Sequence, residues 1–263
     1  MPMAPVNGIE LYYESHGEGP AIVFAHQRAG NHLSWWQQVP VFRKDYRCIT
    51  FDQRGYGASV EPPGGSGTSA FVEDLRQLLD YLGVKRAFLV AHALGGLTCL
   101  GFALAHPERT LGLILGNSTG GVGDPTVVEA ITGLDLLPAD DVPRTLAASF
   151  VGQHPDRTFL YREIAALNPE LNLYIRTASH GSGGPQAADL AKLAVPTMLI
   201  VGAESLIHPV GAIRALQRLI PGSRLEIVQG SAHSTYFEQP EAFNRLVGEF
   251  FANVLAGKSA TPH

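Results

Sequence analysis

One stretch decides the fold of this chain: Phe88-Leu89-Val90-Ala91-His92-Ala93-Leu94-Gly95-Gly96. Its first residues form a continuous apolar run, which is typical of a strand buried on both faces of a sheet. Small residues follow at 93, 95 and 96, and apolar residues then continue to Ala105 before the helix-stopping pair His106-Pro107. The stretch predicts a buried strand over 87–91 that turns sharply into a helix over 93–105.

The flanking sequence repeats this alternation of strands and helices. Strands are predicted over 8–16, 21–25, 48–51, 111–115, 195–201 and 225–228, and helices over 69–82 and 240–255. Strands that alternate with helices form a mostly parallel sheet with right-handed crossovers. The fold class is therefore α/β, with a mostly parallel, doubly wound sheet.

The interval 120–186 breaks this rhythm. It contains no convincing buried strand, has helical patterns near 126–137, 143–152 and 158–178, and ends in a glycine-rich turn. Open α/β sheets bind ligands at the carboxyl ends of their strands, where an inserted segment would form a cover. We predict a core of residues 1–119 and 187–256, a helical cap over 120–186 and a tail over 257–263.

Composition and charge exclude several classes of protein. The net charge is −5 and the 19 basic residues are dispersed, which argues against a nucleic-acid or acidic-membrane surface. The first residues lack the charged and apolar regions of a signal peptide, and we expect a cytoplasmic protein with no membrane span. Neither CxxC nor HExxH occurs, so no metal site and no cofactor is expected. The oligomeric state stays open.

Five segments in this order resemble the α/β-hydrolase superfamily, in particular small lidded esterases, lactonases and carbon–carbon bond hydrolases. The resemblance covers nearly the whole chain and implies the sheet of that superfamily with an inserted helical cap. A single segment is weak evidence, whereas five at successive strand ends are strong evidence. The matching segments are 24–26, 52–59, 91–96, 202–209 and 230–233.

The first departure from that family is Ala93. By resemblance, this position carries the nucleophilic serine of the pattern small-x-Ser-x-Gly, which attacks a carbonyl after giving its proton to a histidine, here His233. Alanine has neither the lone pair nor the proton. Loss of the nucleophile lowers turnover by about a million-fold, so hydrolysis through an acyl-enzyme is excluded for this sequence.

The second departure is Ser205, which stands where the family has an aspartate that orients the histidine. A hydroxyl can bond to the imidazole but does not stabilise imidazolium as a carboxylate does. Its neighbour Glu204 could substitute if the turn rotated. Asn117, after the preceding strand, could also orient His233, although without charge.

The third departure is the loop His26-Gln27-Arg28, where the family has His-Gly-x. By resemblance, the backbone amides of Arg28 and Leu94 form the oxyanion hole. Gln27 narrows the pocket and adds a side-chain amide, and Arg28 adds a cation that could bind an anion. Trp36 is a further candidate for substrate binding, with packing of the first helix as the alternative.

These departures leave three hypotheses. The first is a cofactor-free enzyme that uses a hydrolase pocket for non-hydrolytic acid/base chemistry. Its reaction would be of lyase, isomerase, decarboxylase or cyclase type, on a small apolar carbonyl compound with His233 as acid or base. The second is an ester, lactone or carbon–carbon bond hydrolase inactivated by a serine-to-alanine change, natural or engineered. The third is a ligand-binding protein that performs no chemistry.

Overall fold

The computed structural model describes residues 2–131, 145–168 and 184–258. An eight-stranded sheet runs through it in the order β1-β2-β4-β3-β5-β6-β7-β8. β1 and β2 pair antiparallel, as do β2 and β4, and the strands from β4 to β8 are parallel. The strands are β1 (Met3–Val6), β2 (Ile9–His16), β3 (Ala21–Ala25), β4 (Arg47–Phe51), β5 (Ala87–His92), β6 (Thr110–Gly116), β7 (Thr197–Gly202) and β8 (Arg224–Val228).

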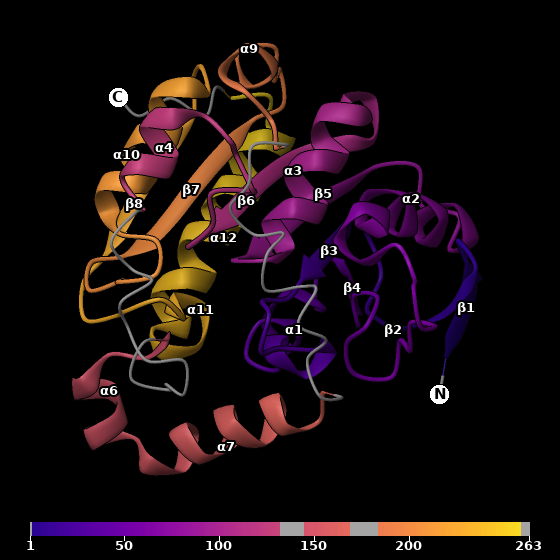
Figure 1. Cartoon of the computed structure of the whole chain (residues 1–263), viewed down its shortest axis with the longest axis horizontal. Coiled ribbons are helices and arrows are strands. Elements are labelled where there is room, and N and C mark those ends of the chain that lie inside the picture. Colours follow the sequence, from indigo (N-terminus) through magenta and orange to yellow (C-terminus); the bar gives the residue numbers. More distant parts are fainter. Residues whose placement is uncertain (1, 132–144, 169–183, 259–263) are drawn as a thin grey trace.

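Helices cover both faces of this sheet (Figure 1). One face packs against α2 (Phe71–Tyr81), α3 (Gly95–Ala105) and α10 (Val210–Leu219), and the other against α1 (Val39–Phe42) and α12 (Pro240–Leu255). Burial of β3, β5 and β7 on both faces explains their uninterrupted apolar sequence. The remaining helical segments are η1 (His32–Trp35), η2 (Gly67–Ala70), η3 (Pro107–Arg109), α4 (Pro125–Glu129), α6 (Ala148–Gln153), α7 (Pro155–Ala166), α9 (Ala187–Leu190) and α11 (Thr235–Glu238).

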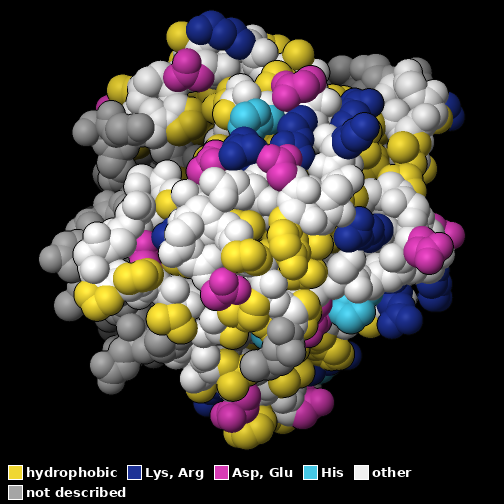
Figure 2. Space-filling model, turned by 90° about the vertical axis from the view of Figure 1, so that its right-hand side faces the viewer, with side chains coloured by type: hydrophobic (Ala, Val, Ile, Leu, Met, Phe, Trp, Pro, Cys, Tyr) yellow, Lys and Arg dark blue, Asp and Glu magenta, His cyan; other side chains and the backbone are white. Residues whose placement is uncertain are grey.

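The predicted α/β class with a mostly parallel sheet is confirmed. The strand β1 was not predicted, because a four-residue edge strand that contains Pro5 carries little sequence signal. Proline removes a backbone donor and is tolerated at an edge, where β1 pairs with β2 alone. The face that carries β1 and α2 shows basic and acidic side chains interspersed, with no field of one sign (Figure 2).

The predicted cap interval contains two kinds of structure. α4 packs beside α10, and its residue Val127 belongs to the hydrophobic core. α6 and α7 lie together at one end of the molecule, away from the sheet (Figure 1). The rest of the predicted helices near 126–137, 143–152 and 158–178 falls partly outside the described residues, so the predicted domain boundaries stay predictions.

Candidate active site

The turn after β5 is built as a strained elbow. Ala93 has φ +46°, in the left-handed region that non-glycine residues rarely adopt. Its N–H donates to the Gly116 carbonyl (3.0 Å), and its own carbonyl accepts from Gly96 N–H (3.0 Å). A Cβ on Gly95 would lie 2.2 Å from the Ala25 carbonyl oxygen, so only glycine allows α3 to start against the end of β3. The elbow backbone is therefore present without a nucleophilic oxygen.

The loop after β3 lies against this elbow and is fixed by His26. The Nε2 atom of His26 accepts from Gln53 N–H (2.9 Å), and Nδ1 lies 2.7 Å from the Gln27 carbonyl oxygen. Both ring nitrogens are thus engaged with backbone. Burial lowers the pKa of His26 to about 4. His26 is a structural residue.

Gln27 and Arg28, which follow in this loop, have different surroundings. The Gln27 amide donates to the hydroxyl of Tyr236 on α11 (2.8 Å), the short helix that follows His233. Arg28 is half-buried and lies close enough to Tyr56 to lower the pKa of that phenol, although burial raises it overall. These positions leave the oxyanion role of the Arg28 amide a prediction.

Leu94 is the residue before the first turn of α3. Backbone N–H groups at this end of a helix have no intrahelical acceptor, which suits the predicted oxyanion role of the Leu94 amide. The Leu94 side chain is buried beside Tyr56 and Phe71. Trp36 is 40% exposed with its ring 6.3 Å from that of Phe237, so its contact with a substrate stays a prediction.

His233 lies in the loop between β8 and α11 and is 3% exposed. Its Nδ1 atom is 3.4 Å from the Ser205 hydroxyl oxygen, a long contact at the position where the family has a carboxylate. Glu204 is exposed, and among the described residues it makes no hydrogen bond with His233. In this conformation Ser205 is buried and Glu204 is exposed, so the alternative in which Glu204 replaces the missing acid still requires the turn to rotate and stays a prediction.

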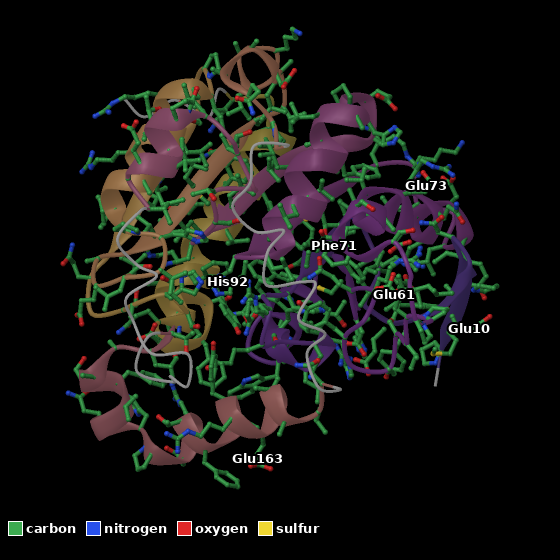
Figure 3. All side chains as sticks on the ribbon, in the orientation of Figure 1. Glu10, Glu61, Phe71, Glu73, His92 and Glu163 are labelled. Atoms are coloured by element: carbon green, nitrogen blue, oxygen red, sulfur yellow. The ribbon has the colours of Figure 1, made fainter. Side chains whose placement is uncertain are left out.

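Two further imidazoles surround His233. The ring centroids of His92 and His208 lie 5.1 and 5.4 Å from that of His233, and both side chains are buried. Burial, followed by the proximity of these two rings, holds the pKa of His233 well below its usual range. Burial likewise lowers the pKa of His92 to about 3. Figure 3 shows His92 in the interior of the molecule. The centre of the site therefore holds neutral imidazole at neutral pH.

Asn117 supports the loop that carries His233 and does not contact the imidazole. Asn117 directly follows β6 and has φ +45°. Its side chain donates to the Ala232 carbonyl (3.2 Å) and accepts from the Thr235 hydroxyl (2.9 Å), one residue before and two after His233. Its own carbonyl oxygen lies 2.7 Å from Nδ1 of His208. In place of the predicted contact with the imidazole, Asn117 bonds to the backbone of Ala232 and the side chain of Thr235 on either side of His233.

The structure also identifies Glu238 as part of this site, which the sequence interpretation missed. Its buried carboxylate accepts from the backbone N–H groups of Ala232 (3.0 Å), Ser234 (3.1 Å) and Ala147 (2.7 Å). The available signal was an acidic residue five positions after the histidine, directly after the aromatic pair Tyr236-Phe237. Within the described ranges, no group of three or more His, Cys, Asp or Glu is arranged to hold a metal ion. No described helix is long and apolar enough to cross a membrane.

The site combines two features of one class of α/β proteins. A left-handed elbow follows the central strand β5 of a mostly parallel sheet, and a loop that carries a histidine follows the last strand β8. A family model described as alpha/beta hydrolase fold matches residues 20–179. The chain belongs to the α/β-hydrolase fold family, as its sequence predicts.

Individual relatives are similar over almost their whole length. 3-Oxoadipate enol-lactonase 2 of Acinetobacter baylyi is 27% identical over 91% of this chain and 92% of its own. A putative 2-succinyl-6-hydroxy-2,4-cyclohexadiene-1-carboxylate synthase of Bacillus subtilis is also 27% identical, over 92% and 95%. The crystal structure of the enol-lactonase from Burkholderia xenovorans LB400 matches with a TM-score of 0.82 at 26% identity, over 95% of this chain and 100% of that one.

Proposed function

We propose that the protein is a cofactor-free enzyme that performs non-hydrolytic acid/base chemistry on a small carbonyl compound, with His233 as the base. One observation carries the proposal. This chain has the buried histidine and the strained elbow of a serine hydrolase, His233 and Ala93. The elbow position lacks the nucleophilic oxygen, and Ser205 stands in place of the acid that would complete a triad. A histidine in this environment can still exchange protons with a bound substrate.

The substrate would meet the Nε2 atom of His233, because Nδ1 is the nitrogen in contact with Ser205. A proton on the carbon next to the substrate carbonyl moves to Nε2, and the electron pair of that C–H bond moves onto the carbonyl oxygen as an enolate. The amides of Leu94 and Arg28 would stabilise this oxyanion. Return of the proton from His233 to another atom of the enolate completes an isomerisation. Alternatively, a group on the carbon next to the enolate carbon leaves with its bonding electron pair and takes the proton from His233, which completes a lyase reaction.

The low pKa of His233 restricts the substrate class. A base whose conjugate acid has a low pKa is weak, and no carboxylate at position 205 stabilises the imidazolium once it forms. The proton must therefore come from an acidic carbon, such as one that lies between two carbonyl groups. We expect a 1,3-dicarbonyl compound or its enol as the substrate. The names of the relatives, an enol-lactonase and a synthase, support small carbonyl compounds as ligands of this scaffold.

Proton abstraction can be tested before the natural substrate is known. Incubated in D₂O with a panel of 1,3-dicarbonyl compounds, the wild-type protein should accelerate deuterium incorporation at the central carbon of at least one, measured by mass spectrometry. His233→Ala should lose this acceleration, and the surface variant His16→Ala should keep it. Equal exchange by wild type and His233→Ala would refute the base assignment. Saturable binding with the compound recovered undeuterated would favour a binding protein.

A second candidate function is that of an ester, lactone or carbon–carbon bond hydrolase whose nucleophile has been replaced. The observation that favours it is the elbow itself, because Ala93 retains φ +46° although alanine gains nothing from this conformation. Restoration is the test. Ala93→Ser, alone or with Ser205→Asp, should give a burst of acyl-enzyme with p-nitrophenyl acetate, detected as a covalent mass increase on residue 93. The non-hydrolytic proposal expects no burst.

A further inference from the structure

Glu238 is a buried carboxylate that binds three backbone N–H groups. It ends α11 and is 4% exposed. One carboxylate oxygen, Oε1, accepts from Ala232 (3.0 Å) and Ser234 (3.1 Å), the two neighbours of His233. The other, Oε2, accepts from Ala147 at 2.7 Å. Among the described residues no cation forms an ion pair with Glu238. The three N–H donors therefore stabilise its charge.

Ala147 lies in the interval 120–186, the predicted cap. It is the N-cap residue of α6, and alanine has no side-chain oxygen with which to satisfy the first amides of that helix. Two further contacts join the same elements, one of them through the Ser234 N–H that Glu238 Oε1 shares with a second acceptor. Ser234 N–H donates to the Thr145 carbonyl (2.9 Å), and the Ser234 hydroxyl lies 2.9 Å from the hydroxyl of Tyr161 on α7. The cap and the loop that carries His233 thus meet at Glu238 and Ser234.

We propose that Glu238 is a positioning residue of the site, one that fixes the backbone on both sides of His233 and holds the cap against that loop with the same carboxylate. This role replaces part of what the missing acid at position 205 would do, since a histidine can be oriented through its backbone as well as through its ring. The importance of this positioning rests on the proposed function of His233, whereas the link between cap and loop does not.

Protonation would weaken the cap side of this link first. A carboxylic acid donates from one oxygen, and that oxygen can no longer accept well from an amide. Oε2 has one amide partner, whereas Oε1 has the Ala232 amide and a share of the Ser234 amide, which also donates to the Thr145 carbonyl, so loss of the Ala147 bond sacrifices fewer contacts. Burial raises the pKa of Glu238 to about 7, against the three amides that lower it, and Glu204 raises it further. Among the described residues, Tyr161 and Tyr236 also interact with Glu238, and His233 lies between its two loop partners.

Glu238→Gln tests the proposal, because glutamine keeps the size of the side chain but has one accepting oxygen and one donating nitrogen. The oxygen should stay with the two loop amides, which leaves the nitrogen facing Ala147 N–H. Amide hydrogen exchange, followed by NMR and corrected for the intrinsic effect of pH, should show protection of Ala147 reduced about tenfold, the effect of one charge-assisted hydrogen bond. Protection of Ala232 should fall less. Glu241→Gln, an exposed glutamate on α12, is the matched control.

The wild-type protein should show the same loss at Ala147 when the pH falls from 8 to 6, and Glu238→Gln should not respond to this change. The NMR titration of the His233 imidazole should shift in Glu238→Gln and not in Glu241→Gln. Unchanged protection of Ala147 in Glu238→Gln, with wild-type pH dependence, would overturn the proposal. These readouts need no turnover, so failure of the deuterium test with His233→Ala would leave them interpretable.

Discussion

Ala93 has a side chain and nevertheless adopts the left-handed backbone conformation, and the cost of this conformation to the stability of the protein can be measured. This conformation costs alanine about 1–2 kcal/mol, whereas glycine adopts it freely but is more flexible in the unfolded chain, by about 0.4–1 kcal/mol. Ala93→Gly should therefore leave the free energy of unfolding unchanged or raise it by about 1 kcal/mol, in urea titrations. Ala103→Gly, in the buried interior of α3, should lower it by about 1 kcal/mol or more. Equal losses in the two variants would show that the elbow carries no strain.

Ser205 sets the charge beside His233. A carboxylate within about 4–6 Å favours imidazolium, and such contacts shift a pKa by about 1–3 units. Ser205→Asp should therefore raise the pKa of His233 from its present low value by about that amount, as measured by NMR titration of the imidazole. Ser205→Asn has nearly the same shape without the charge and should not reproduce the shift. If both variants titrate alike, the contact at position 205 does not control the protonation of His233.

At the scale of elements, the contact between α3 and β3 sets the geometry of the site. A methyl group on Gly95 would meet the Ala25 carbonyl oxygen at 2.2 Å, and backbone cannot move aside as a flexible side chain can. Gly95→Ala should lower the free energy of unfolding by about 2–3 kcal/mol in urea titrations. Gly248→Ala is the contrasting variant. Gly248 lies within α12, and a methyl group there would make only an ordinary contact, 3.8 Å from the Phe42 ring. It should stabilise the protein by about 1 kcal/mol, as alanine does in helices.

The comparison of these elements shows which features a sequence can predict. The strand before Ala93 and the helix after it follow from local patterns, because burial on both faces demands apolar residues and the turn demands small ones. The roles of Asn117 and Glu238 depend on partners more than 80 residues distant (Ala232 and Ala147), and no local pattern encodes such pairs. Likewise, α4 looks like the rest of the inserted segment in sequence, and only its contact with α10 shows that it packs on the core.

At the scale of the whole molecule, buried histidines and the buried Glu238 have opposite effects on how the free energy of unfolding depends on pH. Burial lowers the pKa values of His26 to about 4, of His92 to about 3, and of His233 well below 6.5. Their unfolded forms bind protons below pH 6.5 while the native forms do not, so their contribution to stability is present above pH 6.5 and is lost on acidification. The contribution of Glu238 to stability has the opposite pH dependence. Its native pKa of about 7 exceeds the unfolded value of 4.5, so its contribution is present at low pH and is lost as the pH rises through 7.

Between about pH 5 and 5.5, where an unfolded histidine is almost fully protonated, unfolding should therefore take up about three protons at histidines and release about one at Glu238. Each proton changes the free energy of unfolding by about 1.4 kcal/mol per pH unit, so the net two should lower it by about 2.7 kcal/mol per unit of acidification. Glu238→Gln removes the opposing proton and should steepen this slope to about 4 kcal/mol per pH unit, whatever its effect on stability at neutral pH. Urea titrations at half-unit intervals measure both slopes, with Glu241→Gln as the control. Stability that rises on acidification in the wild-type protein would mean that the three imidazoles are not held neutral, because only the Glu238 proton would then contribute. Identical slopes for wild type and Glu238→Gln would mean that Glu238 is already ionised across this range.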